Sequence, residues 1–273
     1  MSNIDLAYTS LCSQLSEQHQ PNTAIILGSG LGELLGRFNV LSSIEYQQIE
    51  GFPTSTAPSH AGNLHFVEHN NGCIMIFEGR FHPYEGWSAM QSVMPVYLAY
   101  KMGVSNLVIT NAVGALRQEF EPAEVFVVSD HINFTGLSPL VGQNDHSIGS
   151  RFPDMSQPYC SDLRAIARHA LSQHNITFHE GIYAGVLGPE LETSAQRRFL
   201  KQSGCDVVGM SLVLECVAAN HCGMNVLALS AITNSATGDE NQQPDSIDEV
   251  LANAKIAGDK ISLVLPDILS QLN

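Results

Sequence analysis

The chain has 273 residues, of which 44% are hydrophobic and 14% are charged, so it holds enough apolar material for one large α/β domain or two small ones. A formal net charge of −15 argues against a nucleic acid partner, because polyanions bind clustered Lys and Arg side chains. The six cysteines form no C-x-x-C pair and no run of about 18 apolar residues occurs, so we expect reduced thiols, a cytoplasmic location and no membrane partner.

Short apolar runs that end in Gly or Asn alternate with segments of helical period along the chain. This alternation is typical of a mostly parallel sheet covered by helices. The expected strands are 24–27, 63–69, 73–77, 106–110, 124–130, 180–186, 206–210 and 225–233. The expected helices are 3–18, 88–102, 160–174, 193–203, 212–222 and 247–271. No repeat or flexible linker marks a boundary, so we predict a single α/β domain over residues 1–273.

Two long segments, 51–63 and 134–158, have neither helical nor strand periodicity. Irregular segments of this kind inside a compact domain are usually functional or disordered. The first contains His60 and the second contains Phe152, so both residues become candidates for a ligand site.

The first expected strand runs into the sequence GSGLGELLG at residues 28–36, where a helix begins. Glycines at such a turn let backbone N–H groups approach an anion. The spacing does not match the dinucleotide fingerprint, because Glu33 stands in the place of the third glycine, and no Gly-Lys-Ser/Thr of a P-loop follows. A phosphate-binding turn and a plain tight turn both remain open at this point.

Two further strands are expected to end in a turn of the same kind. The chain is expected to leave one strand at Asn111 and Ala112, and Ser211 follows another strand in the position of a helix N-cap. Ligands of open α/β sheets bind beyond the carboxyl ends of the strands. We therefore expect Ser29, the backbone N–H of Ala112 and Ser211 to converge on one anion.

Residues 79–86 read GRFHPYEG, which places Arg80, His82 and Tyr84 at alternate positions. In an extended segment these side chains point to the same side. The row is either an exposed strand edge or an anion clamp, in which Arg80 supplies a permanent cation and His82 a titratable one.

A metal site is a rival interpretation, because His60, His65 and His69 are close in the sequence. No H-E-x-x-H helix or cysteine-containing ligand set accompanies them. The sequence therefore favours solvated or core-edge histidines, and we predict no metal site.

A series of motifs, in the same order along nearly the whole chain, resembles the trimeric purine nucleoside phosphorylases that act on 6-oxopurine nucleosides. The motifs are ILGSGLG (26–32), HAG (60–62), GRFHPYEG (79–86), ITNAVGAL (109–116), DHIN (130–133), SRFPDMS (150–156), GPELET (188–193), VVGMSLVLE (207–215) and AITN (231–234). The resemblance implies a twisted mixed β-sheet flanked by helices, a homotrimer, and reversible phosphorolysis to a purine base and ribose 1-phosphate in purine salvage. Inosine and guanosine are the implied substrates, xanthosine is a further candidate, and no cofactor is implied besides the co-substrate phosphate.

The resemblance also implies roles for individual residues. The implied phosphate-binding residues are Ser29, His60, Arg80, His82, Ala112 and Ser211. The implied ribose contacts are Tyr84, Met210 and, from a neighbouring subunit, Phe152. The implied base contacts are Ala112, Leu191, Glu192, Val208 and Asn234. The residues implied in catalysis are His82, Glu192 and Asn234.

The chemistry of this reaction suits these residue types. Breaking an N-glycosidic bond leaves a cation-like sugar and an electron-rich purine, so catalysis needs an anion beside C1′ and donors on the base. Phosphate supplies the anion and is also the nucleophile, and Arg80 is expected to hold it with a forked pair of N–H bonds. Asn234 is expected to donate to N7 or O6 and Glu192 to accept from N1–H, a pairing that selects a 6-oxopurine over adenine.

Taken singly, some of these residues also have ordinary structural interpretations. Glu192 could belong to a helix N-terminus and Asn234 to a turn. Phe152 and Met210 could be core residues.

The sequence departs from the pattern of the family at four positions. Leu191 replaces an aromatic residue beside Glu192, and Ile247 or a neighbour stands where a histidine is expected to reach the ribose 5′-hydroxyl. Val113 replaces a smaller residue and Leu214 replaces a proline. These changes fall at the sugar and base ends of the expected site.

Two other functions therefore stay open. A 5′-methylthioadenosine phosphorylase would suit the apolar Ile247, although Asn234 in place of an acceptor disfavours adenine. A non-catalytic nucleoside- or phosphate-binding protein on the same fold is the other alternative. The intact set of Arg80, His82, Glu192 and Asn234 argues against it.

Overall fold

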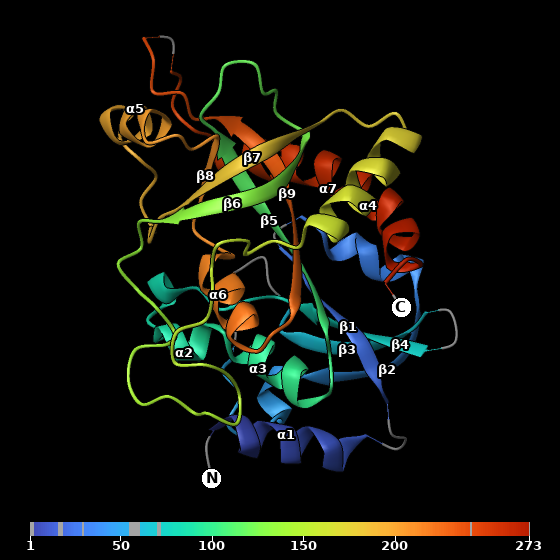
Figure 1. Cartoon of the computed structure of the whole chain (residues 1–273). Coiled ribbons are helices and arrows are strands. Elements are labelled where there is room, and N and C mark those ends of the chain that lie inside the picture. The colour runs from blue at the N-terminus through green and yellow to red at the C-terminus, as the bar shows by residue number, and fades with distance from the viewer. Residues whose placement is uncertain are drawn as a thin grey trace.

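The computed structural model describes residues 3–15, 19–28, 30–54, 61–69, 72–240 and 242–272. These residues form a nine-stranded sheet with helices on both faces (Figure 1). The strands are β1 (Pro21–Ile26), β2 (Asn39–Glu45), β3 (Asn63–His69), β4 (Gly72–Glu78), β5 (Asn106–Ala115), β6 (Val125–Asn133), β7 (Phe178–Gly185), β8 (Val207–Gly209) and β9 (Asn225–Ser235). The helices are α1 (Asn3–Gln14), α2 (Ala89–Ser92), α3 (Met94–Lys101), α4 (Ser161–Gln173), α5 (Ser194–Gln202), α6 (Val213–His221) and α7 (Ile247–Leu269).

The sheet is mixed, and its strand order is β2-β3-β4-β1-β5-β8-β7-β6-β9. The antiparallel pairs are β2–β3, β3–β4, β5–β8 and β6–β9, so the expectation of a mostly parallel sheet needs correction. The twisted mixed sheet implied by the family resemblance is confirmed. The physical reason is clearest at β3 and β4, because only residues 70–71 separate them and a parallel pair needs a connection of about a dozen residues or more.

Part of the sheet closes on itself. Strand β5 pairs with both β8 and β9, so β5, β8, β7, β6 and β9 form a ring. The pairing of β5 with β9 shifts register between Val113 and Gly114, where Thr233 is an extra residue of β9, and the pairing of β6 with β7 shifts between Val128 and Asp130. Such bulges bend a strand and increase its twist, which allows the ring to close.

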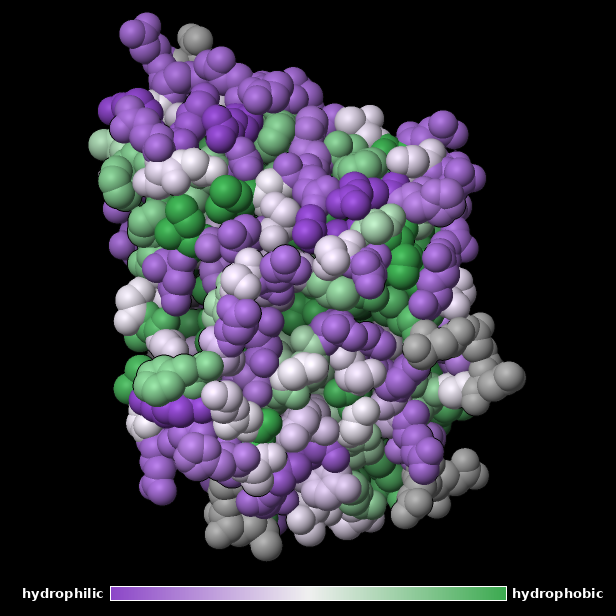
Figure 2. Space-filling model, viewed as in Figure 1, coloured by the Kyte–Doolittle hydropathy of each residue, from purple (hydrophilic) through white to green (hydrophobic). Residues whose placement is uncertain are grey.

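Most of the core lies in two layers, one on each face of the sheet, and a smaller third cluster includes Leu200 of α5 and Val208 of β8. Leu107 and Ile109 of β5 pack with residues of α1, α3 and α6, whereas Val108 packs with residues of α4 and α7. Successive side chains of a strand point to opposite faces, so one strand serves both layers. Figure 2 shows that hydrophilic side chains cover the top of one face and that hydrophobic ones are exposed along its left edge. No helix in the described part of the chain is long and apolar enough to cross a membrane.

The predicted strands and helices are present, with boundaries that differ by a few residues. Strand β2 is an exception, since the sequence pattern does not predict it. The helix expected over 88–102 is divided into α2 and α3 at Val93, and Pro95 lies in the first turn of α3, where its missing N–H does no harm. The first helix ends at Gln14, since Leu15 already lies outside it, and residues 16–18 of the predicted range lie outside the described residues.

Candidate active site

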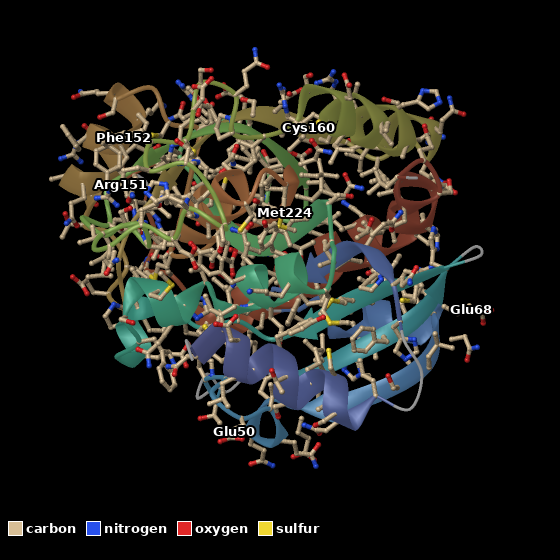
Figure 3. The ribbon with its side chains drawn as sticks, turned by 60° about the horizontal axis from the view of Figure 1, so that its bottom comes forward. Glu50, Glu68, Arg151, Phe152, Cys160 and Met224 are labelled. Atoms are coloured by element: carbon tan, nitrogen blue, oxygen red, sulfur yellow. The ribbon has the colours of Figure 1, made fainter. Side chains whose placement is uncertain are left out.

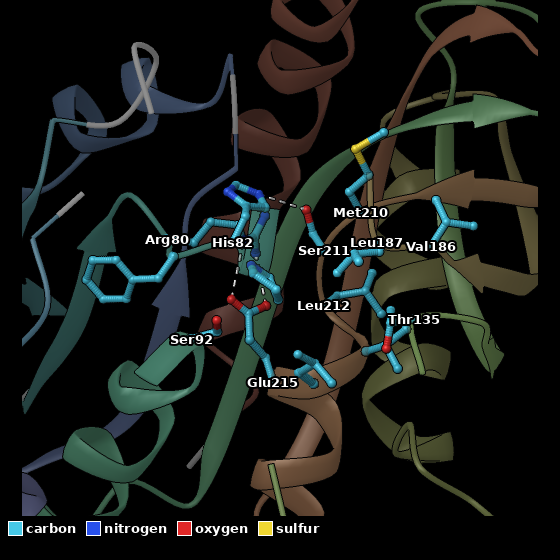
Figure 4. Close-up of a pocket in the computed structure, with 14 residues that line it drawn as sticks. Arg80, His82, Ser92, Thr135, Val186, Leu187, Met210, Ser211, Leu212 and Glu215 are labelled. Atoms are coloured by element: carbon cyan, nitrogen blue, oxygen red, sulfur yellow. Dashed lines mark hydrogen bonds and ion pairs between the residues drawn. The ribbon is translucent and has the colours of Figure 1, made fainter. Parts of the chain in front are cut away.

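A pocket opens where β8 and β9 end and α7 begins, beside the last residues of β5, and its volume is about 310 Å³. Most of the predicted site residues line this pocket, although they come from distant parts of the chain. They are Arg80, His82, Tyr84, Ala112, Leu191, Glu192, Val208, Met210, Ser211 and Asn234. A neighbouring cavity shares Arg80, His82, Met210 and Ser211 with it and extends to Glu215 (Figure 4). Ser29 and His60 lie outside the described residues.

Arg80 follows β4 and is almost completely buried, with 2% of its surface exposed. Its Nε and Nη2 each donate to a carboxylate oxygen of Glu215 at 3.2 Å (Figure 4). Its Nη1 donates to the carbonyl oxygen of Thr110 at 2.8 Å. The sequence assigns a forked pair of Arg80 N–H groups to phosphate, but in this structure the pair formed by Nε and Nη2 binds the Glu215 carboxylate. A forked pair of this kind is strong and directional, so Glu215 fixes the position of Arg80.

Glu215 is absent from the predicted site residues. It lies in the first turn of α6, and 5% of its side chain is exposed. The sequence does contain a signal for it, a single acidic residue in the apolar run SLVLECVAA. An acidic residue in such a run is expected to be buried, and a buried carboxylate needs a cation or several hydrogen-bond donors. The sequence does not reveal which cation, since Arg80 is 135 residues away.

The predicted row of three alternate side chains ends at His82. Pro83–Glu85 form a 3₁₀ turn, because Pro83 fixes a helical φ and the Glu85 carboxylate accepts from the His82 backbone N–H at 2.9 Å. Tyr84 therefore turns back, and its ring stacks on that of His82 with centroids 4.6 Å apart. Both rings still line the pocket.

Glu85 also orients the imidazole of His82. The Nδ1 atom lies 3.0 Å from Glu85 Oε1. Figure 4 shows the contact on the other side of the ring, where Nε2 lies 3.4 Å from Ser211 Oγ. Burial lowers the pKa of His82, and the hydrogen bond to Glu85 opposes that shift. Because a carboxylate only accepts, the neutral ring donates from Nδ1 to Glu85, and its Nε2 accepts from the Ser211 hydroxyl. At neutral pH this end of the pocket therefore combines the cation of Arg80 with a neutral imidazole.

Ser211 does not cap α6, so that expectation is wrong. The cap position is Leu212, whose φ of 52° lies in the left-handed region that is unfavourable for a bulky residue. The Ser211 backbone N–H donates to the Tyr183 hydroxyl at 3.1 Å, while its side-chain oxygen faces His82. The strained turn directs the hydroxyl into the pocket instead of onto the helix.

The predicted strand exit at Asn111 and Ala112 is also wrong. Strand β5 continues to Ala115, because it keeps pairing with β9 beyond the predicted end, with a register shift after Val113. A bulge changes the direction of a strand. Ala112, Val113 and Gly114 line the pocket on both sides of the register shift.

Glu192 lies at the other end of the pocket, just before α5, and 8% of its side chain is exposed. Thr193 caps this helix by accepting from the Gln196 backbone N–H at 3.2 Å, so Glu192 is not the capping residue. Burial raises the pKa of Glu192, whereas its own backbone N–H and the cation of Arg197 lower it. The net shift of the pKa is upward, and the carboxylate lies 3.8 Å from the buried Nε of Arg197.

Asn234 lies inside β9, which rules out its interpretation as a turn residue. Its Oδ1 lies 2.8 Å from Thr233 Oγ1, and its Nδ2 donates to Asp245 Oδ1 at 2.7 Å. The partners assign the two ends of the amide, because a carboxylate only accepts. Asp245 and its partner Arg197 are absent from the predicted site residues, and no local pattern links them.

One side of the pocket is apolar. Leu191 is 46% exposed, Ile247 is 65% exposed and Leu251 is 44% exposed, although all three line the pocket. Met210 lies beside them and is only partly buried, so its interpretation as a core residue is wrong. These side chains form an apolar rim that faces solvent in a single chain.

Phe152 does not line the pocket of its own chain. It lies in the segment 134–158, 85% of it is exposed, and the guanidinium carbon of Arg151 lies 5.9 Å from its ring centroid. Figure 3 shows both residues near the edge of the molecule. The interpretation of Phe152 as a core residue is therefore wrong. An exposed aromatic ring gains burial energy only when another surface covers it.

Within the described ranges, no group of three or more His, Cys, Asp or Glu side chains is arranged to hold a metal ion. His65 is buried in the sheet, and its Nδ1 lies 2.7 Å from Ser43 Oγ. Its Nε2 lies 3.1 Å from Glu78 Oε2. Both ring nitrogens of His65 therefore serve hydrogen bonds within the sheet.

Comparison with known proteins gives a consistent result. The sequence profile of the phosphorylase superfamily matches residues 22–270. The chain is 42% identical over 231 residues to purine nucleoside phosphorylase 1 of Bacillus subtilis, with 85% of each chain covered. It is 40% identical over 265 residues to the purine nucleoside phosphorylase of Mus musculus, with 92% of each covered. The structure is similar to isoform 2 of the Schistosoma mansoni enzyme, solved with cytosine and ribose-1-phosphate, with a TM-score of 0.93, 34% identity, and coverage of 99% of this chain and 96% of that chain.

Proposed function

Because this chain belongs to the phosphorylase superfamily and, within it, to the purine nucleoside phosphorylases, we propose that it cleaves 6-oxopurine nucleosides with inorganic phosphate. The products are the free purine and ribose 1-phosphate, and the reaction is reversible. One observation carries the proposal: a single pocket joins Arg80 and Ser211 at one end to Glu192 and Asn234 at the other. We assign the reaction to purine salvage in the cytoplasm, with residues 1–273 as a single catalytic domain.

Arg80, His82, Ser211 and the neighbouring Ala112 form the proposed phosphate end. A guanidinium has N–H donors around a planar fork, so one side chain can bind Glu215 along one edge and an anion along another. When phosphate binds, the Ser211 hydroxyl can donate to the anion, which leaves the neutral Nε2 of His82 to accept from a protonated phosphate oxygen. We assign Ser29 and His60 to the same end on their motifs alone.

The proposed chemistry follows the charges that develop as the glycosidic bond breaks. Positive charge grows on the ribose, and phosphate beside C1′ both stabilises it and attacks as the nucleophile. Negative charge grows on the purine, where Asn234 donates from Nδ2 to N7 or O6. Tyr84 and Met210 pack against the ribose between these two ends.

Glu192 is the residue that selects a 6-oxopurine in this proposal. An ionised carboxylate accepts from the N1–H of hypoxanthine or guanine, whereas N1 of adenine presents a lone pair to it. A site built for hydrogen bonds rejects such a mismatch strongly. Schistosoma purine nucleoside phosphorylase has been solved both with hypoxanthine and with adenosine. Binding alone therefore does not establish base preference, and the test of this role of Glu192 is the ratio of cleavage rates for inosine and adenosine.

The apolar rim supports a second candidate substrate. Ile247 and Leu251 line the pocket and offer no polar group from their side chains to a ribose 5′-hydroxyl. This favours a nucleoside with an apolar 5′-substituent, such as 5′-methylthioadenosine. The donor end of Asn234 disfavours its adenine base, so we rank it below inosine, guanosine and xanthosine.

Inosine cleavage is expected to require phosphate and to yield ribose 1-phosphate, because the nucleoside pocket contains a cationic anion-binding end. Purine release and ribose 1-phosphate are measured with and without phosphate for inosine, guanosine, xanthosine and 5′-methylthioadenosine. Equal rates in phosphate-free buffer would identify a hydrolase. Binding of hypoxanthine without cleavage of any of these nucleosides would identify a binding protein instead.

We further propose that the protein is a homotrimer in which Phe152 covers the ribose in a neighbouring subunit. In a cyclic trimer each interface is heterologous, so one exposed residue can close each neighbouring pocket in turn. The exposed ring of Phe152 and the open apolar rim at Ile247 and Leu251 are the two surfaces that such contact would cover.

Phe152→Ala is expected to raise the KM for nucleoside about tenfold, since an aromatic contact contributes about 1.5 kcal/mol. The KM for phosphate is expected to stay nearly unchanged, because in this proposal the ring covers the ribose and not the phosphate end. Val141→Ala serves as the control, since Val141 is an equally exposed apolar residue of the same segment at 82%.

Mixing two variants tests whether the site is shared. Phe152→Ala chains retain an intact pocket, and Glu192→Gln chains retain an intact Phe152. Mixed trimers are expected to regain some sites with the low KM. Active monomer near 29.5 kDa, or mixed trimers without recovery, would contradict the shared site.

A further inference from the structure

The amide of Asn234 has two hydrogen-bond partners, Thr233, which also lines the pocket, and Asp245, which does not. Thr233 Oγ1 lies 2.8 Å from the Asn234 amide oxygen and 3.1 Å from the Val113 carbonyl oxygen, so its one hydrogen is available to either acceptor. The amide nitrogen of Asn234 donates to Asp245 at 2.7 Å. An ionised carboxylate has no hydrogen to donate, so Asp245 accepts only the nitrogen end of the amide. The orientation with oxygen toward Asp245 is therefore disfavoured.

Asp245 is itself held by a buried cation. Its Oδ2 accepts a hydrogen bond from Arg197 Nη2, and the exposed fractions of the two side chains are 11% and 4%. Arg197 comes from α5, whereas Asp245 lies just before α7. The segment after β9 packs closely on α5, because a Cβ atom at Gly238 would lie 2.5 Å from the carbonyl oxygen of Ser194.

Arg197 also faces the second base-reading residue. Its Nε lies 3.8 Å from Glu192 Oε2, and within the described part of the chain this buried Nε has no hydrogen-bond partner. A buried donor without a partner is unfavourable, and a positive charge so close to a carboxylate favours its ionised form. One buried cation therefore lies between Asp245, which orients Asn234, and Glu192.

From these contacts we infer that Asp245 and Arg197 are positioning residues that set the preference for a 6-oxo base. Asp245 keeps the nitrogen end of Asn234 as a donor for N7 or O6, and Arg197 keeps Glu192 ionised as the acceptor for N1–H. Neither residue touches the base itself. The inference rests on the proposed phosphorolysis of purine nucleosides and adds the residues that determine its base specificity.

Asp245→Asn tests the first half of this assignment in the full-length enzyme. An amide at position 245 can donate or accept, so Asn234 can present either end to the base. We expect the ratio of kcat/KM for inosine to kcat/KM for adenosine, measured at saturating phosphate, to fall about tenfold or more. An equal fall for both nucleosides would overturn the inference, because a purely structural role lowers both rates alike.

Asp239→Asn is the matched control. It makes the same chemical change in the same segment, but Asp239 Oδ2 accepts from Gln118 and Thr237 instead of Asn234. The inosine to adenosine ratio is expected to stay at the wild-type value. A similar fall in this control would show that any loosening of the segment changes specificity, which would also overturn the inference.

Arg197 is tested through the pH dependence of the rate. The charged groups that face Glu192 are Arg197, which lowers its pKa, and Asp245, which raises it. In Arg197→Met the pKa of Glu192 rises further above its ordinary value, so the acid limb of kcat/KM for inosine is expected to move to higher pH. Arg197→Lys restores the charge and is expected to return the limb toward the wild type. A limb that does not move in Arg197→Met contradicts the assignment.

Failure of the proposed function can be distinguished from failure of this inference. If the proposed function is wrong, the wild-type protein cleaves neither inosine nor adenosine with phosphate. In that case calorimetric Kd values of hypoxanthine and adenine for the wild type and Asp245→Asn test the same preference without turnover. A ratio of Kd values that is unchanged by the substitution overturns the inference. Thermal unfolding of each variant identifies a fold that is lost, and Asp245→Asn, which preserves side-chain shape, remains decisive if Arg197→Met does not fold.

Discussion

Replacing Arg80 with methionine is expected to lower the free energy of unfolding by about 3–5 kcal/mol, because the change leaves the Glu215 carboxylate buried without its cation. It is also expected to lower kcat/KM for phosphate by about 10²–10³-fold, the usual effect of removing a strong donor from a dry site. Urea unfolding measures the first effect, and steady-state kinetics with varied phosphate measures the second.

The double variant Arg80→Met/Glu215→Leu separates the two effects. An apolar replacement of a buried ion pair is often neutral or stabilising, so the free energy of unfolding is expected to return close to the wild-type value. Phosphate-dependent activity is expected to remain low. If activity returns together with stability, Arg80 has a structural role only and the proposed phosphate end is wrong.

Asn234→Asp is expected to shift the preference from 6-oxopurines toward 6-aminopurines. A carboxylate replaces the amide donor at N7 or O6 and offers an acceptor to the N6–H₂ group of adenine. The ratio of kcat/KM for inosine to that for adenosine is expected to fall by about 10²-fold or more, because polar sites reject mismatched hydrogen-bonding groups strongly.

Asp245 complicates this substitution, because it already lies 2.7 Å from the Asn234 amide nitrogen. Two carboxyl groups at this distance share a proton, and one of their pKa values rises strongly. The double variant Asn234→Asp/Asp245→Asn exchanges donor and acceptor, so the amide introduced at position 245 donates to the carboxylate introduced at position 234. We expect the lowest inosine to adenosine ratio in this variant. An unchanged ratio in both variants would show that Asn234 does not read the base.

Local patterns in the sequence were sufficient to predict the interior strands. A strand that is covered on both faces reads as an unbroken apolar run, and this is a property of a few neighbouring residues. The run 106–110 is an example, and it lies within β5. Strand-end reasoning from the residues alone reached Ala112 and Ser211, which line the pocket. Glu192, Met210 and Asn234 also line it, but they were assigned only through the resemblance to the phosphorylase family.

Local patterns were insufficient where pairing between distant segments decides the structure. Strand β2 is mostly exposed, so its side chains do not form an apolar run that the sequence could reveal. It is a strand because it pairs with β3 in the antiparallel direction. The ring of strands depends on β5 pairing with both β8 and β9. The strand exit expected at Ala112 fails for the same reason, since the partner β9 extends β5 to Ala115.

The amino-acid sequence by itself determined which residue types the site contains, and only the tertiary structure decided how their charges are paired. A lone Glu215 in an apolar run already indicates a buried carboxylate that needs a cation. Its partner Arg80 is 135 residues away. Asn234 meets Asp245 only because the segment between β9 and α7 folds back onto the end of β9. Ionic and hydrogen-bond partners must approach within about 4 Å, a condition that depends on the folded path of the chain and not on local periodicity.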